Sequence, residues 1–331
     1  MTRLNADPPQ SIRVTAPARL HLGFVDLDGG LGRRFGSIGL TLEAPATVVS
    51  LRQAGADVAS GPDSQRAVGH LAMLRRAWGV DAPVALSVER AIPPHAGLGS
   101  GTQLGLAVGL GLARLHGIPA TPEAVAAILD RGARSGIGVA AFARGGFLVD
   151  GGKAPADTAP PPAIARLPFP EDWRVLLIQD HAVRGVHGVA ETAAFDELPP
   201  FQPALAAHLC RLVLMRLLPG IARADIEAAG TAVAEIQRAV GDHFAPFQGG
   251  GRFTSPQVAE VLGWLDRKGI AGLGQSSWGP TGFALLPDRA AAGRLAAEAG
   301  ERFAGSGLDF RVVAGRNRPG AIETVGREAE R

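Results

Sequence analysis

The sequence predicts an α+β protein of two halves, each of which mixes strands and helices. Three observations favour this class: short stretches rich in alternating apolar and β-branched residues, amphipathic helical stretches between them, and a proline-rich segment at 153–168 that separates the two groups. We expect an N-terminal half over 1–160 and a C-terminal half over 161–331, closely packed against each other.

The first half contains strands, turns and helices in a clear order. Alternation around Val14, Leu20 and Leu22 predicts a strand pair or a bent strand over 11–26, before a glycine-rich turn at 28–39. Further elements are expected in this order: a strand at 41–53, a helix at 64–79, a strand at 84–92, a glycine-rich loop that opens a helix, a helix that starts at Thr121 and Pro122, and a strand with a glycine turn that ends the stretch 135–152.

The second half begins after the proline-rich segment. We expect a buried strand at 173–180, two helices at 203–218 and 221–240, a glycine-rich turn and strand within 269–287, a helix at 289–303 and a strand at 308–315.

Composition excludes several classes of protein. With 46% hydrophobic and 19% charged residues among its 331, the chain is globular, and a formal net charge of +2 without a dense basic block argues against a nucleic-acid partner. Cys210 is the only cysteine, so an intramolecular disulfide is impossible, and its apolar surroundings predict a buried side chain. Residues 1–10 lack a signal-peptide core and no charge-free run of about 18 apolar residues is present, so we expect a cytoplasmic protein with no membrane anchor.

The stretch PPHAGLGSGTQLG (93–105) carries the strongest functional signal. Glycines between a strand and a helix let backbone N–H groups approach phosphate, and the helix adds its positive end. Ser100 and Thr102 can donate to phosphate or meet magnesium; the alternative is that Ser100 caps the helix and the glycines serve packing. We assign the phosphate site to Pro94, Gly97, Leu98, Gly99, Ser100, Gly101, Thr102 and Gln103.

Other polar residues are candidates for catalysis, substrate binding or metal binding. Each has a plainer alternative, such as a surface ion pair for Arg19, turn capping for Asp26 and Asp28, solvation for Arg33 and Arg34, an exposed loop position for His95, and the core for Trp278. The candidate catalytic residues are Arg19, His21, Asp26, His95 and Arg134. The candidate substrate-binding residues are Arg33, Arg34, Ser135, Gly136, Gln275, Ser276, Ser277 and Trp278. Asp26 and Ser100 are the candidate magnesium ligands. Asp180, His181 and His187 stay undecided between ligands and ordinary polar residues.

Three stretches, PARLHLGFVD, PPHAGLGSGTQ and GLGQSSWGPTGFAL, resemble the GHMP small-molecule kinase superfamily. More narrowly, residues 19–43, 93–109, 134–152 and 274–284 resemble the beta-ribofuranosylaminobenzene 5′-phosphate synthase family. This resemblance implies a GHMP-kinase-like fold and a homodimer. It also implies an enzyme of tetrahydromethanopterin biosynthesis that joins 5-phosphoribosyl 1-diphosphate to 4-aminobenzoate or 4-hydroxybenzoate and releases CO₂ and diphosphate. We expect magnesium, no organic cofactor, and small-molecule substrates as the partners.

Two departures from the kinase pattern weaken a kinase interpretation. Kinases of the superfamily usually read GLGSSA, whereas here Gly101 and Thr102 follow Ser100, and their PSGxD segment becomes RSGIG, with Gly138 at the aspartate position. Both changes remove groups that phosphoryl transfer to a hydroxyl uses. An ATP-dependent kinase and a non-catalytic phosphate- or nucleotide-binding homologue remain the alternatives.

Overall fold

Two long N-terminal strands organise the larger sheet. The computed structural model describes residues 11–185 and 188–325. In it β1 (Ser11–Asp26) and β2 (Phe35–Gln53) pair antiparallel, with register shifts between Pro17 and Arg19 and between His21 and Gly23. Such irregularities bend a strand and redirect its side chains. The prediction for 11–26 is therefore confirmed as one bent strand.

The larger sheet has seven strands among the described residues. Its order is β11-β1-β2-β4-β3, while β5 joins β2 and carries β6 on its other side. The remaining strands are β3 (Val58–Ser60), β4 (Val84–Arg90), β5 (Phe147–Asp150), β6 (Ala163–Leu167) and β11 (Ala321–Thr324). Strands β6 and β11 bring the C-terminal part of the chain into the N-terminal sheet.

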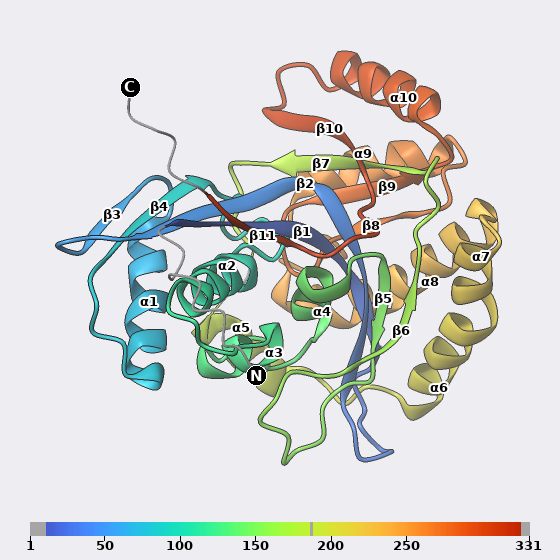
Figure 1. Ribbon diagram of the computed structural model, residues 1–331. Coiled ribbons are helices and arrows are strands. Elements are labelled where there is room, and N and C mark those ends of the chain that lie inside the picture. Colours follow the sequence, from blue (N-terminus) through green and yellow to red (C-terminus); the bar gives the residue numbers. More distant parts are fainter. Residues whose placement is uncertain (1–10, 186–187, 326–331) are drawn as a thin grey trace.

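Four helices cover one face of this sheet (Figure 1). They are α1 (Ser64–Trp78), α2 (Ser100–Leu115), α3 (Pro122–Ile128) and α4 (Ile137–Arg144). Helix α2 is apolar on nearly every side because it is buried between the sheet and α1, α3 and α4. A Cβ at Gly111 would lie 2.5 Å from Leu51 Cδ1, so this glycine permits the close approach of α2 to β2.

The C-terminal half has its own four-stranded antiparallel sheet, in the order β10-β7-β9-β8. Its strands are β7 (Arg174–Asp180), β8 (Leu273–Gln275), β9 (Gly282–Leu286) and β10 (Leu308–Ala314). Its helices are α5 (Val189–Glu197), α6 (Pro203–Leu212), α7 (Leu218–Ala222), α8 (Ile226–Phe244), α9 (Pro256–Arg267) and α10 (Arg289–Arg302), with a π-helical turn at Val213–Leu217 and a 3-10 turn at Ala245–Phe247.

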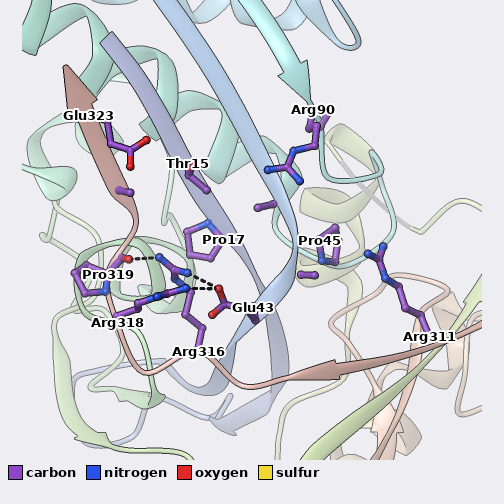
Figure 2. Close-up of a pocket in the computed structure, with 14 residues that line it drawn as sticks. Thr15, Pro17, Glu43, Pro45, Arg90, Arg311, Arg316, Arg318, Pro319 and Glu323 are labelled. Carbon is purple, nitrogen blue, oxygen red and sulfur yellow. Dashed lines mark hydrogen bonds and ion pairs between the residues drawn. The ribbon is translucent and has the colours of Figure 1, made fainter. Parts of the chain in front are cut away.

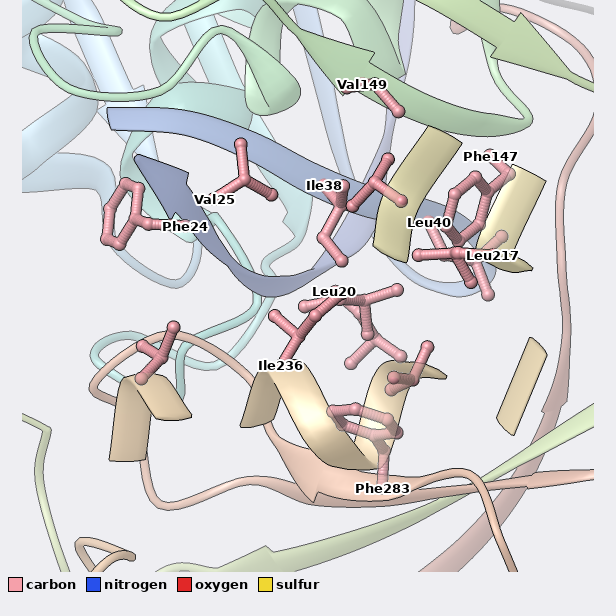
Figure 3. Packing of buried hydrophobic residues seen from close by; sticks show 14 of the residues in the cluster. Leu20, Phe24, Val25, Ile38, Leu40, Phe147, Val149, Leu217, Ile236 and Phe283 are labelled. Carbon is pink, nitrogen blue, oxygen red and sulfur yellow. The ribbon is translucent and has the colours of Figure 1, made fainter. Parts of the chain in front are cut away.

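A shared hydrophobic core joins the two halves. Figure 3 shows Leu20, Ile38 and Leu40 of the large sheet facing Ile236 of α8, with Phe283 of the small sheet beyond. All five side chains are fully buried. The predicted two-half α+β class is confirmed, while the boundary at 160/161 stays a prediction.

Several elements differ from the sequence expectations. The proline-rich segment, expected as a loop or boundary, contains β6, which pairs with β5. Cys210 is exposed rather than buried, because α6 turns Ala206 and Leu209 toward the core instead. Residues 1–10, where we expect no signal peptide, and His187 lie outside the described residues.

One helical stretch in the described part of the chain, Pro203–Ala222, is long and apolar enough to span a membrane by length and composition alone. It has a mean hydropathy of 1.5 and carries Arg211 and Arg216. Leu209 and Leu217 lie in the shared core, and helices of a protein core meet the same criterion.

Candidate active site

The glycine-rich loop ends at the amino terminus of α2, as the sequence predicts. Gly97 and Gly99 have φ of +80° and +83°, in the left-handed region that glycine adopts readily. Helix α2 starts at Ser100 and has no acidic residue in its first turn, so its first N–H groups and its positive end are available to an anion.

Arg19 of β1 lies directly against this loop. Its Nη1 donates to the carbonyl oxygen of Gly97 at 2.5 Å, and its Nε has no partner in the described structure. Burial lowers the pKa of Arg19 to about 10, and Glu191 offsets this only in part. A guanidinium that is partly desolvated and incompletely paired favours an anionic ligand.

Two further arginines face the same loop. Together with Arg19, Arg66 and Arg131 line a cavity of about 390 Å³ that also contains Gly97, Gly99, Ser100, Gly101 and Thr102. A Cβ at Gly101 would lie 3.5 Å from Arg131 Nη1 and 3.9 Å from Arg66 Nη1. Arg66 forms an ion pair with Asp63, and burial together with Arg66 lowers the pKa of Arg131. The lining is strongly positive, because Glu191 is its one described carboxylate.

Glu191 connects Arg134 to the cavity. Its carboxylate lies 2.8 Å from Arg134 Nη2, and the Arg134 guanidinium stacks over Phe195 at 4.6 Å from the ring centre. Arg134 itself does not line the cavity. A phosphate that enters the cavity would repel the Glu191 carboxylate and attract the Arg134 guanidinium.

The late stretch Gln275–Trp278 ties the loop to β1 and forms a wall of the cavity. Ser276 Oγ donates to the carbonyl oxygen of Gly97 at 2.7 Å and accepts from His21 N at 3.0 Å. Ser277 and Trp278 line the cavity, and the Trp278 ring packs 4.6 Å from Phe244, with Nε1 unpartnered among the described residues. Gln275 is engaged elsewhere, since its Oε1 accepts from Thr254 N at 2.6 Å.

His21 is buried behind this wall. Burial first, and the nearby Arg19 second, lower its pKa to about 3, so the imidazole is neutral at pH 7. It lines a small neighbouring cavity of about 20 Å³ with Phe24 and Trp278 and is absent from the lining of the loop cavity. A neutral histidine with this pKa is not a proton donor at neutral pH.

Some predicted site residues have structural partners instead. Gln103 is fully buried and its Nε2 donates to the carbonyl oxygen of Gly138 at 2.7 Å. Asp150 accepts from Gly136 N at 2.8 Å and from Ser135 Oγ at 3.3 Å, which holds the segment in place. Leu98 lies in the core and Pro94 is exposed outside the cavity lining.

The structure does not bring Asp26, Arg33 or Arg34 to the loop. Asp26 Oδ1 accepts from Asp28 N and Gly29 N, the turn capping weighed as the plainer alternative. Arg33 donates to the carbonyl oxygens of Gly151 and Gly152 and pairs with Asp157. The Arg34 Nε donates to the carbonyl oxygen of Leu27. Asp26 and Ser100 therefore lie at different cavities and do not form a shared magnesium site.

The residues that the structure does gather around the loop include Arg19, His95, Ser277 and Trp278, together with Arg66, Arg131 and Glu191, which sequence analysis missed. Arg66 lies near the start of α1 and Arg131 follows α3, where isolated arginines carry no motif. Asp180, left undecided from sequence, accepts from Ser255 Oγ at 2.6 Å and serves the fold.

Comparisons with known proteins show the family to which the chain belongs. Residues 65–146 match the GHMP kinases N terminal domain and residues 217–305 match the GHMP kinases C terminal model. A beta-ribofuranosylphenol 5'-phosphate synthase from Methanothermobacter thermautotrophicus is 33% identical over 83% of this chain and 89% of its own. A protein of the same name from Archaeoglobus fulgidus is 32% identical, covering 94% and 99% of the two chains.

The chain belongs to the beta-ribofuranosylphenol 5'-phosphate synthase family. It is therefore an enzyme, and the relatives' name, a synthase of a ribofuranosyl compound, agrees with the predicted pentosyltransferase class. The family name specifies a phenol where the sequence resemblance named an aminobenzene. Homoserine kinase from Cytophaga hutchinsonii has the same fold, with a TM-score of 0.68 at 18% identity, and the similarity covers 97% of this chain and 100% of the kinase.

Proposed function

We propose that this synthase condenses 5-phosphoribosyl 1-diphosphate with a para-substituted benzoate, 4-hydroxybenzoate or 4-aminobenzoate, and releases CO₂ and diphosphate. The observation that carries the proposal is the strongly basic cavity around the amino terminus of α2, which Arg19, Arg66 and Arg131 line together. A helix amino terminus and arginine forks are the groups that bind phosphate esters in proteins.

In this proposal the two phosphate-bearing ends of the sugar substrate occupy neighbouring parts of this cavity. The diphosphate lies over Gly99–Thr102, where the α2 N–H groups and Arg19 stabilise the charge that develops as it leaves. The 5-phosphate lies beside Arg66 and Arg131. The benzoate occupies the wall of Ser277 and Trp278, where an aromatic face can hold its ring in line with the anomeric carbon.

The reaction balances without a base. The bond between the anomeric carbon and diphosphate breaks, and the para substituent pushes electrons onto the ring carbon that carries the carboxylate. That carbon bonds to the anomeric carbon, and the bond to the carboxylate then breaks, so its electron pair restores the ring and CO₂ leaves. No proton is gained or lost overall.

The lining of the cavity favours this chemistry over phosphoryl transfer. Gly138 stands where the kinase pattern has its aspartate, and a Cβ there would lie 3.1 Å from Thr102 Cγ2. Glu191, the described carboxylate of the lining, is paired with Arg134. A kinase would need a group here to accept the proton of an alcohol.

We also propose that magnesium accompanies the diphosphate. No group of three or more His, Cys, Asp or Glu side chains suited to a metal is found in the described residues. The hydroxyls of Ser100 and Thr102 fit an ion held chiefly by substrate oxygens and water, which is how Mg²⁺ commonly binds. When bound, magnesium would neutralise charge on the departing diphosphate.

The remaining expectations belong to the same proposal. We propose that the enzyme is a cytoplasmic homodimer, that it needs no organic cofactor, and that its product is used in tetrahydromethanopterin biosynthesis. Their support is the sequence resemblance, and the family name of the relatives favours 4-hydroxybenzoate as the aromatic substrate.

A carboxyl-labelled assay tests the proposal. Purified protein is incubated with 5-phosphoribosyl 1-diphosphate, magnesium and carboxyl-labelled 4-hydroxybenzoate or 4-aminobenzoate, with and without ATP. We expect labelled CO₂ at the same rate in both conditions, and faster with 4-hydroxybenzoate. Absence of labelled CO₂ together with ATP consumption would support a kinase, and inactivity with retained phosphate binding would support a non-catalytic homologue.

A further inference from the structure

A larger cavity lies away from the phosphate loop, on the opposite face of the seven-stranded sheet. Its volume is about 830 Å³, and Figure 2 shows it between β1, β2 and the end of β4 on one side and the segment 311–319 on the other. Thr15 lines it, whereas the neighbouring Val14 and Ala16 pack under the helices, because successive side chains of a strand alternate between faces. It shares no lining residue with the loop cavity.

Positive charge dominates this cavity. Four arginines and two glutamates line it, at positions 90, 311, 316, 318, 43 and 323. Both glutamates are already engaged: Glu43 Oε1 accepts from Arg316 Nη1 at 2.8 Å and from Arg318 Nη2 at 2.6 Å, and Glu323 lies 3.8 Å from Arg13. One carboxylate shared between two guanidiniums leaves an excess of positive charge.

Arg316 is the anchor of this arrangement. It is 7% exposed, its Nη2 donates to the carbonyl oxygen of Pro319 at 2.7 Å, and its Nε has no partner in the described structure. Burial lowers its pKa despite the nearby Glu43. Arg316 therefore shares its single carboxylate partner, Glu43, with Arg318 and keeps one buried N–H unpaired, so one net positive charge of this trio is left without a partner.

Arg90 and Arg311 supply two more cations. Both are exposed and both line the cavity, and neither guanidinium has a hydrogen-bond or ion-pair partner among the described residues, although Arg90 acts electrostatically on the neighbouring Glu89. Figure 2 shows their side chains on either side of Pro45. A guanidinium with all its donors available binds carboxylate or phosphate through two parallel hydrogen bonds.

The remaining lining is small, rigid and apolar. Pro17, Pro45 and Pro319 contribute ring faces, and Ala44, Ala46 and Ala91 add little bulk. Prolines have fixed φ and no side-chain freedom to fill the space. A volume of about 830 Å³ is in the range of sites for small organic molecules, and its charged side chains suit a ligand that is itself charged.

From these observations we infer that the cavity of Arg90, Arg311, Arg316 and Arg318 is a second ligand site, which binds a small organic polyanion such as a phosphorylated or polycarboxylate metabolite. The anionic groups pair with Arg90 and Arg311, and the carbon skeleton packs on the proline faces. Two chain connections lead from here to the catalytic cavity. Pro17 is two residues before Arg19 on β1, and Ala91 is two residues before the loop that starts at Pro93.

Calorimetric titration of the full chain tests this site. Two probes are used: citrate, which is a polycarboxylate, and fructose 1,6-bisphosphate, which is an organic phosphate. The probe that binds shows whether the site takes carboxylate or phosphate groups. We expect one equivalent of at least one probe at this cavity, in addition to any bound at the loop cavity, and we expect the double substitution Arg90→Ala and Arg311→Ala to weaken this equivalent tenfold or more. The matched control Arg289→Ala with Arg294→Ala removes the same charge from exposed positions of α10 and should bind as the unmodified chain does.

A variant at the loop separates the two cavities. Gly99→Ala should leave the equivalent that R90A/R311A weakens unchanged, since Gly99 does not line this cavity, and should affect only binding at the loop cavity. The inference is overturned if neither probe binds at millimolar concentration, or if R90A/R311A binds like the unmodified chain. It also fails if the α10 control weakens binding equally, or if R90A/R311A changes the oligomeric state in gel filtration, which would make the cavity an interface between copies.

Discussion

Replacement of Gly99 by alanine separates backbone strain from loss of the phosphate site. Gly99 has φ of +83°, and a Cβ there would lie 3.3 Å from both Cζ and Nε of Arg19. A non-glycine residue in this region costs about 1–2 kcal/mol. The same methyl requires the guanidinium that donates to Gly97 to shift by a few tenths of an ångström, which weakens its interaction with the substrate.

The expected size of the effect follows from these two terms. A complete hydrogen bond to a charged group contributes about 1.5–3 kcal/mol, so kcat/KM for 5-phosphoribosyl 1-diphosphate should fall, by roughly 150-fold at most. Gly117→Ala is the matched control, because Gly117 has φ of +67° and a Cβ there would meet no heavy atom within 4 Å. The free energy of unfolding of Gly117→Ala should fall by about 1–2 kcal/mol, as much as backbone strain lowers that of Gly99→Ala, and its kcat/KM should not change.

The assay combines labelled CO₂ release with urea unfolding of both variants. Gly99→Val, which adds a β-branched side chain, should abolish turnover in a protein that still folds. The reasoning is refuted if Gly99→Ala retains the kcat/KM of the unmodified enzyme. It is refuted equally if Gly117→Ala loses as much activity, since strain alone would then explain the loss.

Three further substitutions test other parts of the account. Arg131→Gln removes a cation of the loop cavity and should raise KM for the phosphorylated substrate roughly tenfold or more, whereas Arg294→Gln on the exposed face of α10 should not; equal KM values for the two variants would argue against the 5-phosphate site. Gly138→Asp restores the carboxylate of the kinase pattern, but its Cβ would lie 3.1 Å from Thr102 Cγ2. CO₂ release should therefore drop at least tenfold, and no ATP-dependent phosphorylation should appear. A gain of ATP-dependent phosphorylation would contradict the proposal. His70 is buried, and burial followed by Arg131 and Arg66 lowers its pKa from 6.5 to about 4. Between those pH values the unfolded chain holds a proton that the folded chain lacks, so stability falls as pH falls through this window, by about 1.4 kcal/mol per pH unit for this group. His70→Gln should remove that part of the slope in urea titrations at several pH values, and an unchanged slope would show that His70 is not its source.

The sequence predicted the parts of the site that local chemistry determines. Gly97 and Gly99 between a strand and a helix indicated a phosphate loop because few other residues adopt that backbone, and Arg19 on β1 does reach it. The resemblance to the kinase superfamily also identified Gly138 at the position of the kinase aspartate, since the absence of a carboxylate there can be seen without a structure.

The remaining features depended on tertiary contacts. Arg66 and Arg131 reach the loop because α1 and the end of α3 pack around α2, which no local pattern encodes. Asp26 had the residue type of a metal ligand, but the backbone N–H groups two and three residues later satisfy it first. Cys210 lies in an apolar stretch, yet a helix buries one side only, and its position on α6 faces outward.

The central claim is that the arginine-lined cavity at the amino terminus of α2 promotes the departure of diphosphate from the sugar. At the same time, the ring carbon of the benzoate exchanges its bond to the carboxylate for a bond to the anomeric carbon. Carbon-13 NMR tests it directly, with substrate sugar labelled at the anomeric carbon and 4-hydroxybenzoate labelled at the ring carbon that carries the carboxylate, in the absence of ATP. The account predicts a product in which the two labelled carbons show one-bond coupling, together with equal amounts of CO₂ and diphosphate. A product joined through oxygen, or a benzoate that keeps its carboxylate while the sugar loses diphosphate, would contradict it.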